Sequence, residues 1–358
     1  MSMERVAITG SSGFYGKAVI EALRRSRPQV EILGLDVVQP TESAPDRFER
    51  CDVLSPDVER LLQEFRPDTV VHLAFIVNPI RDESRMHAVN VDGTQNVLTA
   101  ATNVGAVRVL VSSSATAYGA WDDNPVPMTE DHPLRARAEY RYADDKVHVE
   151  RMLKEFADEH PEIAVSWTRP CMIYGPGLTN YLTEFIVKGP LIALPGSNNT
   201  PLQFIHLEDV ADASVAILTA NARGAFNLAP SDWFTLRDLG RWSGRRCLPV
   251  PMQACLLFTK IWWGLRLPFF NFPSGLWYFI RYPWVVAPQR LEREIGFRCR
   301  RSSRDVITQL LKDSGKLVAD LESALDLNDR RSTEMASQVS GPKMMSRCSD
   351  SEAKSNRE

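Results

Sequence analysis

Paired cysteines and clustered histidines are both missing from this chain. Its six cysteines include no Cys-x-x-Cys and no paired spacing, so the sequence predicts free thiols and a reducing compartment rather than a disulfide framework. The six histidines form no metal-ligand pattern, and we expect no metal site. The first strand-like segment begins within a few residues of the start, which leaves no room for a signal peptide. These absences together predict a cytoplasmic protein.

Strong charge and long apolar runs are also missing. The formal net charge is −3, which gives no reason to expect nucleic acid as a partner. Residues 254–288 are rich in aromatics, but charged residues and prolines interrupt them, so they fall short of the roughly 20 apolar residues that a spanning helix needs. We interpret this segment as a hydrophobic cap. The alternatives are an entrance for a lipophilic substrate or an interfacial surface; peripheral membrane contact is not favoured but stays open.

What the chain does have is a glycine-rich turn close to its start. Residues 5–9 suit a buried strand, Gly10, Gly13 and Gly16 follow at intervals of three, and an amphipathic run begins at Lys17. In a strand–turn–helix unit of this kind, the first glycine permits the turn, the second lets the backbone approach a pyrophosphate, and the third lets the helix pack close to the strand. The flanking pattern therefore predicts a dinucleotide site.

An acidic residue ends the second predicted strand. Residues 30–36 read as a strand, and Asp36 lies twenty residues beyond Gly16. A carboxylate at this position can accept hydrogen bonds from the adenosine ribose and would repel a 2′-phosphate. An exposed acid at a strand end is the plainer interpretation, but position and spacing together favour NAD over NADP.

Strand and helix signals alternate through the first half of the chain. Strands are predicted at 6–9, 30–36, 69–73, 107–112 and 163–168, and helices at 16–25, 56–64, 86–101 and 139–159. This alternation predicts an α/β protein with a Rossmann-type doubly wound parallel sheet and a smaller C-terminal substrate-binding subdomain. We assign residues 1–178, with a returning segment at about 203–230, to the NAD-binding domain. Residues 179–202 and 231–327 form the predicted cap, and residues 328–358 a disordered tail.

The predicted helix 139–159 carries a tyrosine and a lysine on one face. Tyr142 and Lys146 are four residues apart, which places them side by side. An ammonium near a phenol favours the phenolate, so the tyrosine could exchange a proton near neutral pH. Tyr140 is the nearby competitor, but four residues on it meets Asp144, which would disfavour its phenolate. The pair alone is common on helix surfaces; three serines at 112–114, at the end of a predicted strand, make it significant.

Together these motifs make the chain resemble an extended short-chain dehydrogenase/reductase of the NAD-dependent epimerase/dehydratase family. The resemblance covers about residues 3–230 and rests on the glycine turn at 9–16, Asp36, the serine-rich segment 112–119, Tyr142 with Lys146, and segments 169–177 and 204–210. It implies hydride transfer between a substrate hydroxyl carbon and nicotinamide, with Tyr142 as the acid/base. The implied catalytic residues are Ser114, Tyr142 and Lys146. The implied cofactor residues are Gly10, Ser12, Gly13, Phe14, Tyr15, Gly16, Asp36, Asp52, Val53, Leu73, Ala74, Asn90, Ser112, Tyr142, Lys146, Pro170 and Ile173.

Two departures from the family pattern bear on the substrate. Ala115 and Thr116 stand where sugar dehydratases of this family carry an Asp-Glu pair, so dehydration is disfavoured. Leu202 and Gln203 stand where relatives that bind nucleotide sugars often carry an arginine, which weakens the nucleotide-sugar hypothesis. A nucleotide-sugar epimerase and a 3β-hydroxysteroid-dehydrogenase-like enzyme on a hydrophobic alcohol therefore both stay open. A non-catalytic NAD sensor is the alternative of another class. A homodimer through 86–101 and 139–159 would resemble the family.

Overall fold

A computed structural model describes residues 3–178, 189–265 and 273–318. Its centre is a seven-stranded parallel sheet with strand order β11-β6-β5-β4-β1-β2-β3. This order confirms the predicted doubly wound fold, because it reverses direction between β1 and β4. The strands are β1 (Arg5–Thr9), β2 (Glu31–Asp36), β3 (Arg47–Arg50), β4 (Thr69–His72), β5 (Arg108–Ser112), β6 (Ala164–Pro170) and β11 (Gly224–Leu228).

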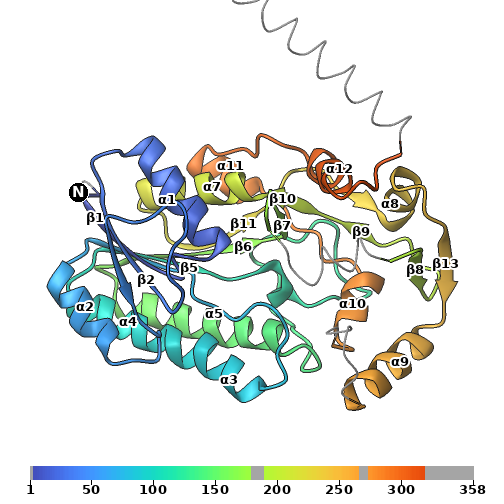
Figure 1. Cartoon of the computed structure of the whole chain (residues 1–358), viewed down its shortest axis with the longest axis horizontal. Helices are drawn as coiled ribbons and strands as arrows, with labels where there is room; N and C mark the ends of the chain where they lie inside the picture. Colours follow the sequence, from blue (N-terminus) through green and yellow to red (C-terminus); the bar gives the residue numbers. More distant parts are fainter. Residues whose placement is uncertain (1–2, 179–188, 266–272, 319–358) are drawn as a thin grey trace, which may run out of the picture.

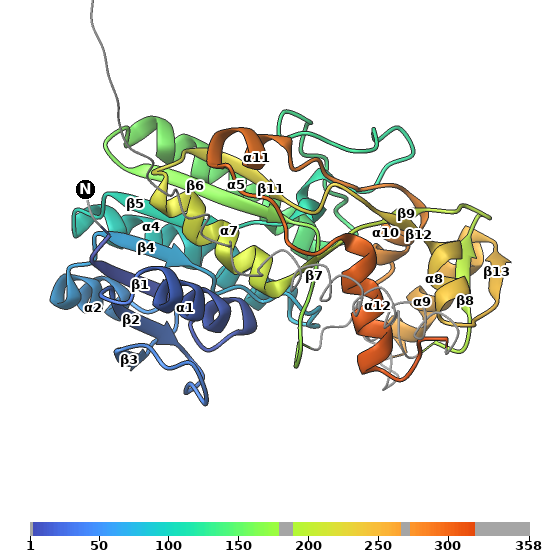
Figure 2. The ribbon, with the colours of Figure 1, turned by 90° about the horizontal axis from the view of Figure 1, so that it is seen from above.

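Helices cover both faces of the sheet, and each face has its own apolar core. Helices α1 (Phe14–Ser26) and α7 (Leu207–Thr219) pack together on one face. Helices α2 (Asp57–Phe65), α4 (Gly93–Asn103) and α5 (Arg141–Glu159) lie on the other (Figures 1 and 2). The strands are buried on both sides, as parallel strands require, and therefore read as continuous apolar runs in the sequence.

One predicted helix is divided in the structure. The segment 86–101 lies within α3 (Glu83–His87), a π-helical turn (Ala88–Asp92) and α4. A π-helical turn inserts an extra residue into the helix and is frequent at functional sites. Asn90 lies in this turn and is fully buried, so the insertion turns a polar side chain into the interior.

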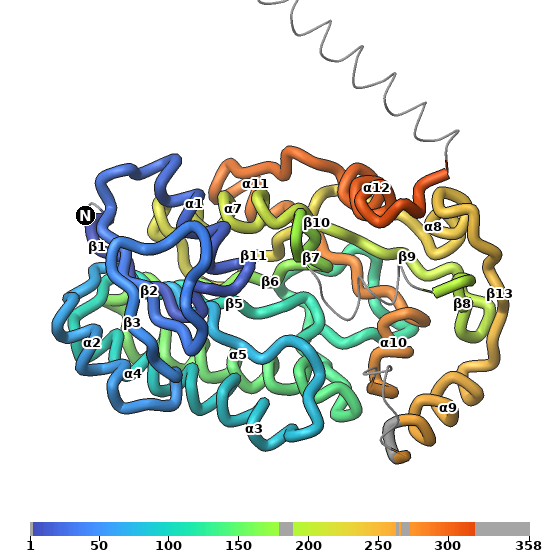
Figure 3. Tube along the Cα trace, viewed as in Figure 1, coloured from blue at the N-terminus to red at the C-terminus, as the bar shows by residue number. Residues whose placement is uncertain are grey.

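A second group of elements gathers at the end of the sheet opposite the N-terminus (Figure 1). Strands β8 (Ile192–Pro195) and β13 (Cys247–Val250) pair there although they are far apart in the sequence (Figure 3). Helices α8 (Leu236–Trp242), α9 (Met252–Gly264) and α10 (Leu276–Arg281) surround them. The remaining elements are the ladders β7 (Met172–Tyr174) with β10 (Phe204–His206) and β9 (Pro201–Leu202) with β12 (Phe234–Thr235), and helices α11 (Gln289–Ile295) and α12 (Ser303–Asp313).

The division into a Rossmann domain and a cap stays a prediction. The predicted tail 328–358 and the cap residues 179–188, 266–272 and 319–327 lie outside the described residues.

None of the helices in the described part of the chain has both the length and the apolar character needed to cross a membrane.

Candidate functional site

A cavity of about 330 Å³ opens at the carboxyl ends of the strands. Ligands of doubly wound sheets bind at this edge. Residues from β5, the helix α5 and the segments after β1, β4 and β6 line it, so distant parts of the chain converge there. Twelve of the predicted site residues are among the lining: Gly10, Gly13, Phe14, Tyr15, Gly16, Leu73, Ser112, Ser114, Tyr142, Lys146, Pro170 and Ile173.

The glycine turn has the geometry that a bound pyrophosphate requires. Gly10 has a φ of +72°, a conformation that L side chains rarely adopt. A Cβ on Gly16 would overlap the carbonyl oxygen of Gly10, so only glycine lets α1 begin this close to β1. The helix has no side-chain cap at Gly13, which leaves the N–H groups of its first turn for an anionic ligand. These features fit NAD.

Asp36 is held at the end of β2 by two backbone N–H groups. The amide of Ser12 donates to Oδ2 and the amide of Val38 to Oδ1, each over 2.9 Å. A carboxylate has about four acceptor positions, so both oxygens can still accept from a ribose. Asp36 does not line the cavity itself; it lies beside the glycine turn that does.

Five more of the predicted cofactor residues lie outside the cavity lining, and one of them is Ser12 in the glycine turn. Asp52 accepts from the amide of Leu54 and forms an ion pair with Arg85 at 2.6 Å. Val53 packs against Gly93 on α4. Ala74 lies in the segment after β4. Asn90 lies in the π-helical turn.

Asn90 joins α5 to the loop after β4. Its Oδ1 accepts from the amide of Ile76 over 2.8 Å, and its Nδ2 donates to Asp145 over 3.2 Å. Asp145 is fully buried and also contacts His87 at 2.8 Å and Arg141 at 3.0 Å. Because Asp145 precedes Lys146 on α5, this network fixes the part of the helix that faces the cavity.

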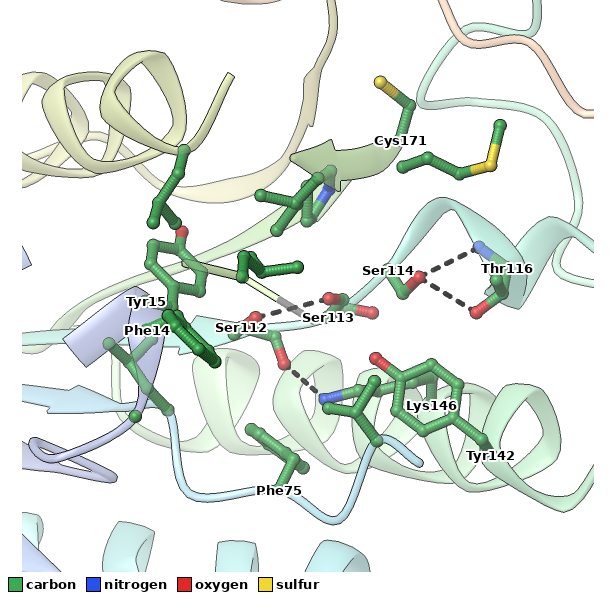
Figure 4. A pocket seen from close by; sticks show the side chains of 18 of the residues that line it. Phe14, Tyr15, Phe75, Ser112, Ser113, Ser114, Thr116, Tyr142, Lys146 and Cys171 are labelled. Carbon is green, nitrogen blue, oxygen red and sulfur yellow. Dashed lines mark hydrogen bonds between the residues drawn. The ribbon is translucent and has the colours of Figure 1, made fainter. Parts of the chain in front are cut away.

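Lys146 is fully buried at the base of the cavity (Figure 4). Its Nζ donates to the carbonyl of Ser112 over 2.6 Å and lies 2.9 Å from the centre of the Phe75 ring. Burial lowers the pKa of Lys146 well below its usual value, and the carboxylates of Glu150 and Asp145 act in the opposite direction. The Ser112 carbonyl and the Phe75 ring face favour the ammonium as well.

Ser114 begins the short 3₁₀ helix Ala115–Tyr118 after β5. Its Oγ accepts from the amide of Thr116 over 3.2 Å and from the Thr116 hydroxyl over 2.9 Å. The Ser114 hydrogen is therefore left to donate. The neighbouring Ser113 donates to Glu150 instead, so of these two serines only Ser114 is placed for a substrate. Figure 4 shows the Tyr142 hydroxyl on the same side of the cavity as Ser112, Ser114 and Lys146.

A neutral histidine supports the same end of the sheet. His72 is fully buried at the end of β4, between the hydroxyls of Thr9 at 2.7 Å and Thr94 at 3.0 Å. Burial lowers its pKa to about 3, and Lys146 adds to the effect. His72 therefore carries no charge near neutral pH and connects β1, β4 and α4 by hydrogen bonds.

The apolar half of the cavity comes from two segments that the sequence singled out, 204–210 as a family motif and 254–288 as the aromatic cap, without assigning single residues to the cavity. Phe204, Leu207 and Trp284 line it from segments more than 50 residues beyond Lys146. Their positions depend on long-range packing that no local motif encodes. Other lining residues lie within the predicted motifs or up to three residues from a predicted position: Phe75, Val77, Thr116, Tyr140, Cys171 and Met172.

The chain is similar to known proteins over most of its length. The model of the "NAD dependent epimerase/dehydratase family" matches residues 6–229. An uncharacterized protein of Mycobacterium tuberculosis is 26% identical over 254 residues, which cover 69% of this chain and 67% of that protein. UDP-glucose 4-epimerase of Neisseria meningitidis serogroup A is 26% identical over 359 residues, covering 90% of this chain and 100% of the enzyme.

Solved structures show the same fold. UDP-glucose 4-epimerase of Thermus thermophilus in complex with NAD has a TM-score of 0.66 at 22% identity and covers 88% of this chain and 100% of its own. UDP-glucose 4-epimerase of Thermotoga maritima with UDP-glucose has a TM-score of 0.67 at 18% identity and covers 87% of this chain and 99% of its own. The chain belongs to the NAD-dependent epimerase/dehydratase family and is an NAD-dependent enzyme.

Proposed function

We propose that the chain is an NAD-dependent epimerase that acts on a secondary hydroxyl of a UDP-sugar, with Tyr142 as its acid/base. The observation that carries this proposal is the convergence of Ser114, Tyr142 and Lys146 on one cavity beside the glycine turn. Bound there, NAD would accept a hydride from the substrate carbon and return it. The protein's own residues orient the substrate and move its hydroxyl proton.

Each of the three side chains has a distinct role in this proposal. Ser114 donates its remaining hydrogen to the substrate oxygen. Tyr142 takes the hydroxyl proton and later gives it back. The Lys146 ammonium favours the phenolate form of Tyr142; burial opposes the charge on this lysine, while the Ser112 carbonyl and the Phe75 ring support it.

Elimination of water is not supported by the site. Thr116 stands at one of the two positions where a dehydratase of this family would carry its acids, and its hydroxyl donates to Ser114. The other position is Ala115, which is fully buried. The proposal is therefore epimerisation or simple oxidation rather than dehydration. A non-catalytic sensor is not favoured, because all three groups that the chemistry needs are present in one cavity.

The support for a UDP-sugar as substrate comes from the relatives and not from a cation seen to face its diphosphate. Curated UDP-glucose 4-epimerases match most of this chain. Lys188, Arg237 and Arg290 are the cations outside the motifs that could bind the diphosphate, and Lys188 lies outside the described residues. Arg290 donates to the carbonyls of Ala225 and Arg223 at the edge strand β11, which removes it from the candidates. Arg237 is the second residue of α8, is exposed and does not line the cavity.

A dehydrogenase for a hydrophobic alcohol is the second candidate, and the lining of the cavity favours it. Leu178, Leu207, Phe204, Met172 and Trp284 form an apolar wall. Among the described lining residues Lys146 is the sole cation, and it is buried at the base. A doubly charged diphosphate placed against this wall would be costly to desolvate.

One incubation distinguishes the two candidates. The protein with NAD is offered UDP-glucose, UDP-galactose or a panel of hydrophobic secondary alcohols, and product and NADH absorbance are followed together. Conversion between the two UDP-sugars without NADH accumulation is expected. NADH accumulation with an alcohol, and no change in either sugar, would replace the epimerase by the dehydrogenase.

Asp36 should make the enzyme select NAD over NADP. We expect NAD to bind at least several-fold more tightly, because Asp36 accepts from the ribose and repels a 2′-phosphate. Titration of both dinucleotides measures the ratio. Asp36→Asn should lower the ratio of NAD affinity to NADP affinity. Asp57→Asn, which changes an exposed acid on α2, should leave this ratio unchanged. Equal affinities in the unaltered protein would exclude this role for Asp36.

A further inference from the structure

Helix α9 exposes a row of large apolar side chains to solvent. Leu257 is 59% exposed, Phe258 52%, Ile261 51% and Leu265, just beyond the helix, 65%. Their spacing places them on one face. The opposite face carries Met252, Cys255 and Thr259, which are buried against the rest of the cap. The helix is therefore apolar on both sides, and packing within the described protein accounts for only one of them.

The chain around this helix carries charge of one sign. No aspartate or glutamate occurs between Asp238 and Glu292, although the whole chain has 45 acidic residues. Seven basic residues lie in the same interval: Arg241, Arg245, Arg246, Lys260, Arg266, Arg281 and Arg290. Lys260 is exposed on α9 itself, and Arg246 is exposed where the chain enters β13. Helix α9 itself therefore carries one exposed basic residue and no acid beside its exposed apolar row, in a protein of net charge −3.

We propose that this face of α9 docks on the surface of an anionic lipid bilayer. Apolar side chains with flanking lysine and arginine are the pattern of helices that lie in the membrane interface. The helix has 13 residues, about 20 Å in length, so it is shorter than the roughly 30 Å hydrocarbon core and lies along the surface. The absence of acids from α9 and from its flanking sequence favours anionic lipid over a protein partner, whose interface would pair charges of both signs.

This docking surface is close to the wall of the main cavity. Helix α9 packs against α10, and Phe279 and Ile280 of α10 line a small apolar cavity together with Trp284. Trp284 also lines the main cavity. Docking through α9 would therefore place the apolar side of the active-site region next to the bilayer. The inference concerns a surface and does not depend on which substrate the enzyme takes.

Vesicle co-sedimentation of the full chain tests the proposal. We expect binding to phosphatidylcholine vesicles that contain phosphatidylglycerol, weak binding to phosphatidylcholine alone, and a loss of binding at high salt. The double variant L257E/I261E should lower the affinity at least about tenfold, because each side chain loses its burial in lipid. Lys260→Gln should lower it about fivefold. The matched control Val126→Glu, at an apolar side chain also exposed but outside the cap, should change nothing.

Several results would overturn the proposal. One is that the chain does not bind anionic vesicles. Another is that it binds neutral and anionic vesicles equally well. A third is that the double variant binds anionic vesicles as well as the unaltered chain does. Self-association that the double variant abolishes, without any lipid binding, would identify a second copy of the chain as the occupant. Melting temperature and NAD affinity verify that the variants fold; if the double variant does not, unaltered binding by Lys260→Gln would reject the proposal by itself.

Discussion

Tyr142→Phe should lower turnover by about 10² to 10⁴-fold and leave NAD affinity nearly intact. Removing the hydroxyl removes the proton transfer, for which a positioned side chain typically supplies an acceleration of this size. The ring itself remains and continues to fill its place in the cavity lining. Turnover of the substrate identified by the incubation above and titration with NAD measure the two effects separately.

Tyr140→Phe is the matched control for this variant. Tyr140 lines the same cavity, two residues away, and its ring packs edge-on against Phe279 at 5.5 Å and near Tyr142 at 5.9 Å. Loss of its hydroxyl should have a mild effect, because it precedes the first turn of α5 and lacks a lysine four residues on. If Tyr140→Phe lost most of its turnover while Tyr142→Phe stayed active, Tyr140 rather than Tyr142 would be the acid/base.

The sequence predicts elements well where local pattern and tertiary packing agree. Strands β1, β2, β4 and β5 differ from prediction by one residue at an end. Strand β3 was not predicted, because its four residues, two arginines with Phe48 and Glu49, lie at the sheet edge and carry no apolar alternation. The π-helical turn in the segment 86–101 was missed as well, since helical periodicity does not report a single inserted residue.

In the candidate site, too, residues placed by local motifs were predicted better than residues placed by long-range packing. Motif residues that follow consecutive strands were found, because parallel strands bring their carboxyl ends to one edge. Trp284 was expected only as one member of the aromatic segment 254–288, because its place in the cavity depends on how the cap folds back. The sequence alone leaves Arg290 free to bind a substrate diphosphate, but the structure directs its guanidinium to the carbonyls of Ala225 and Arg223. No spacing rule in the sequence distinguishes these outcomes.

A buried ion pair holds the polar layer beneath the site. Glu150 of α5 and Arg169 of β6 are 3% and 5% exposed. The Arg169 Nε donates to the two carboxylate oxygens over 2.9 and 3.0 Å. Ser113 and the Trp167 indole also donate to Glu150, and Arg169 reaches the Tyr118 hydroxyl over 2.6 Å. The pair thus connects α5, which carries Tyr142 and Lys146, to β5 and β6.

Arg169→Met should lower the free energy of unfolding by about 3–5 kcal/mol, because it leaves the Glu150 carboxylate buried without a counter-charge. Chemical denaturation measures the change. The double variant E150L/R169M should cost clearly less than the sum of the two single variants, since replacing both charges removes the unpaired one. On the surface, Arg60→Met breaks an exposed pair with Glu64 and should have little effect.

The comparison of these variants separates two accounts of the pair. If Glu150 and Arg169 act mainly through charge, the interaction free energy from the double-mutant cycle is large, and the double variant recovers much of the loss. If they act mainly by filling space, the two single losses add. Additive losses, or an Arg169→Met variant no less stable than Arg60→Met, would contradict the expectation. In that case the position of α5 would depend on its apolar contacts and on the Asp145 network with Asn90 and His87.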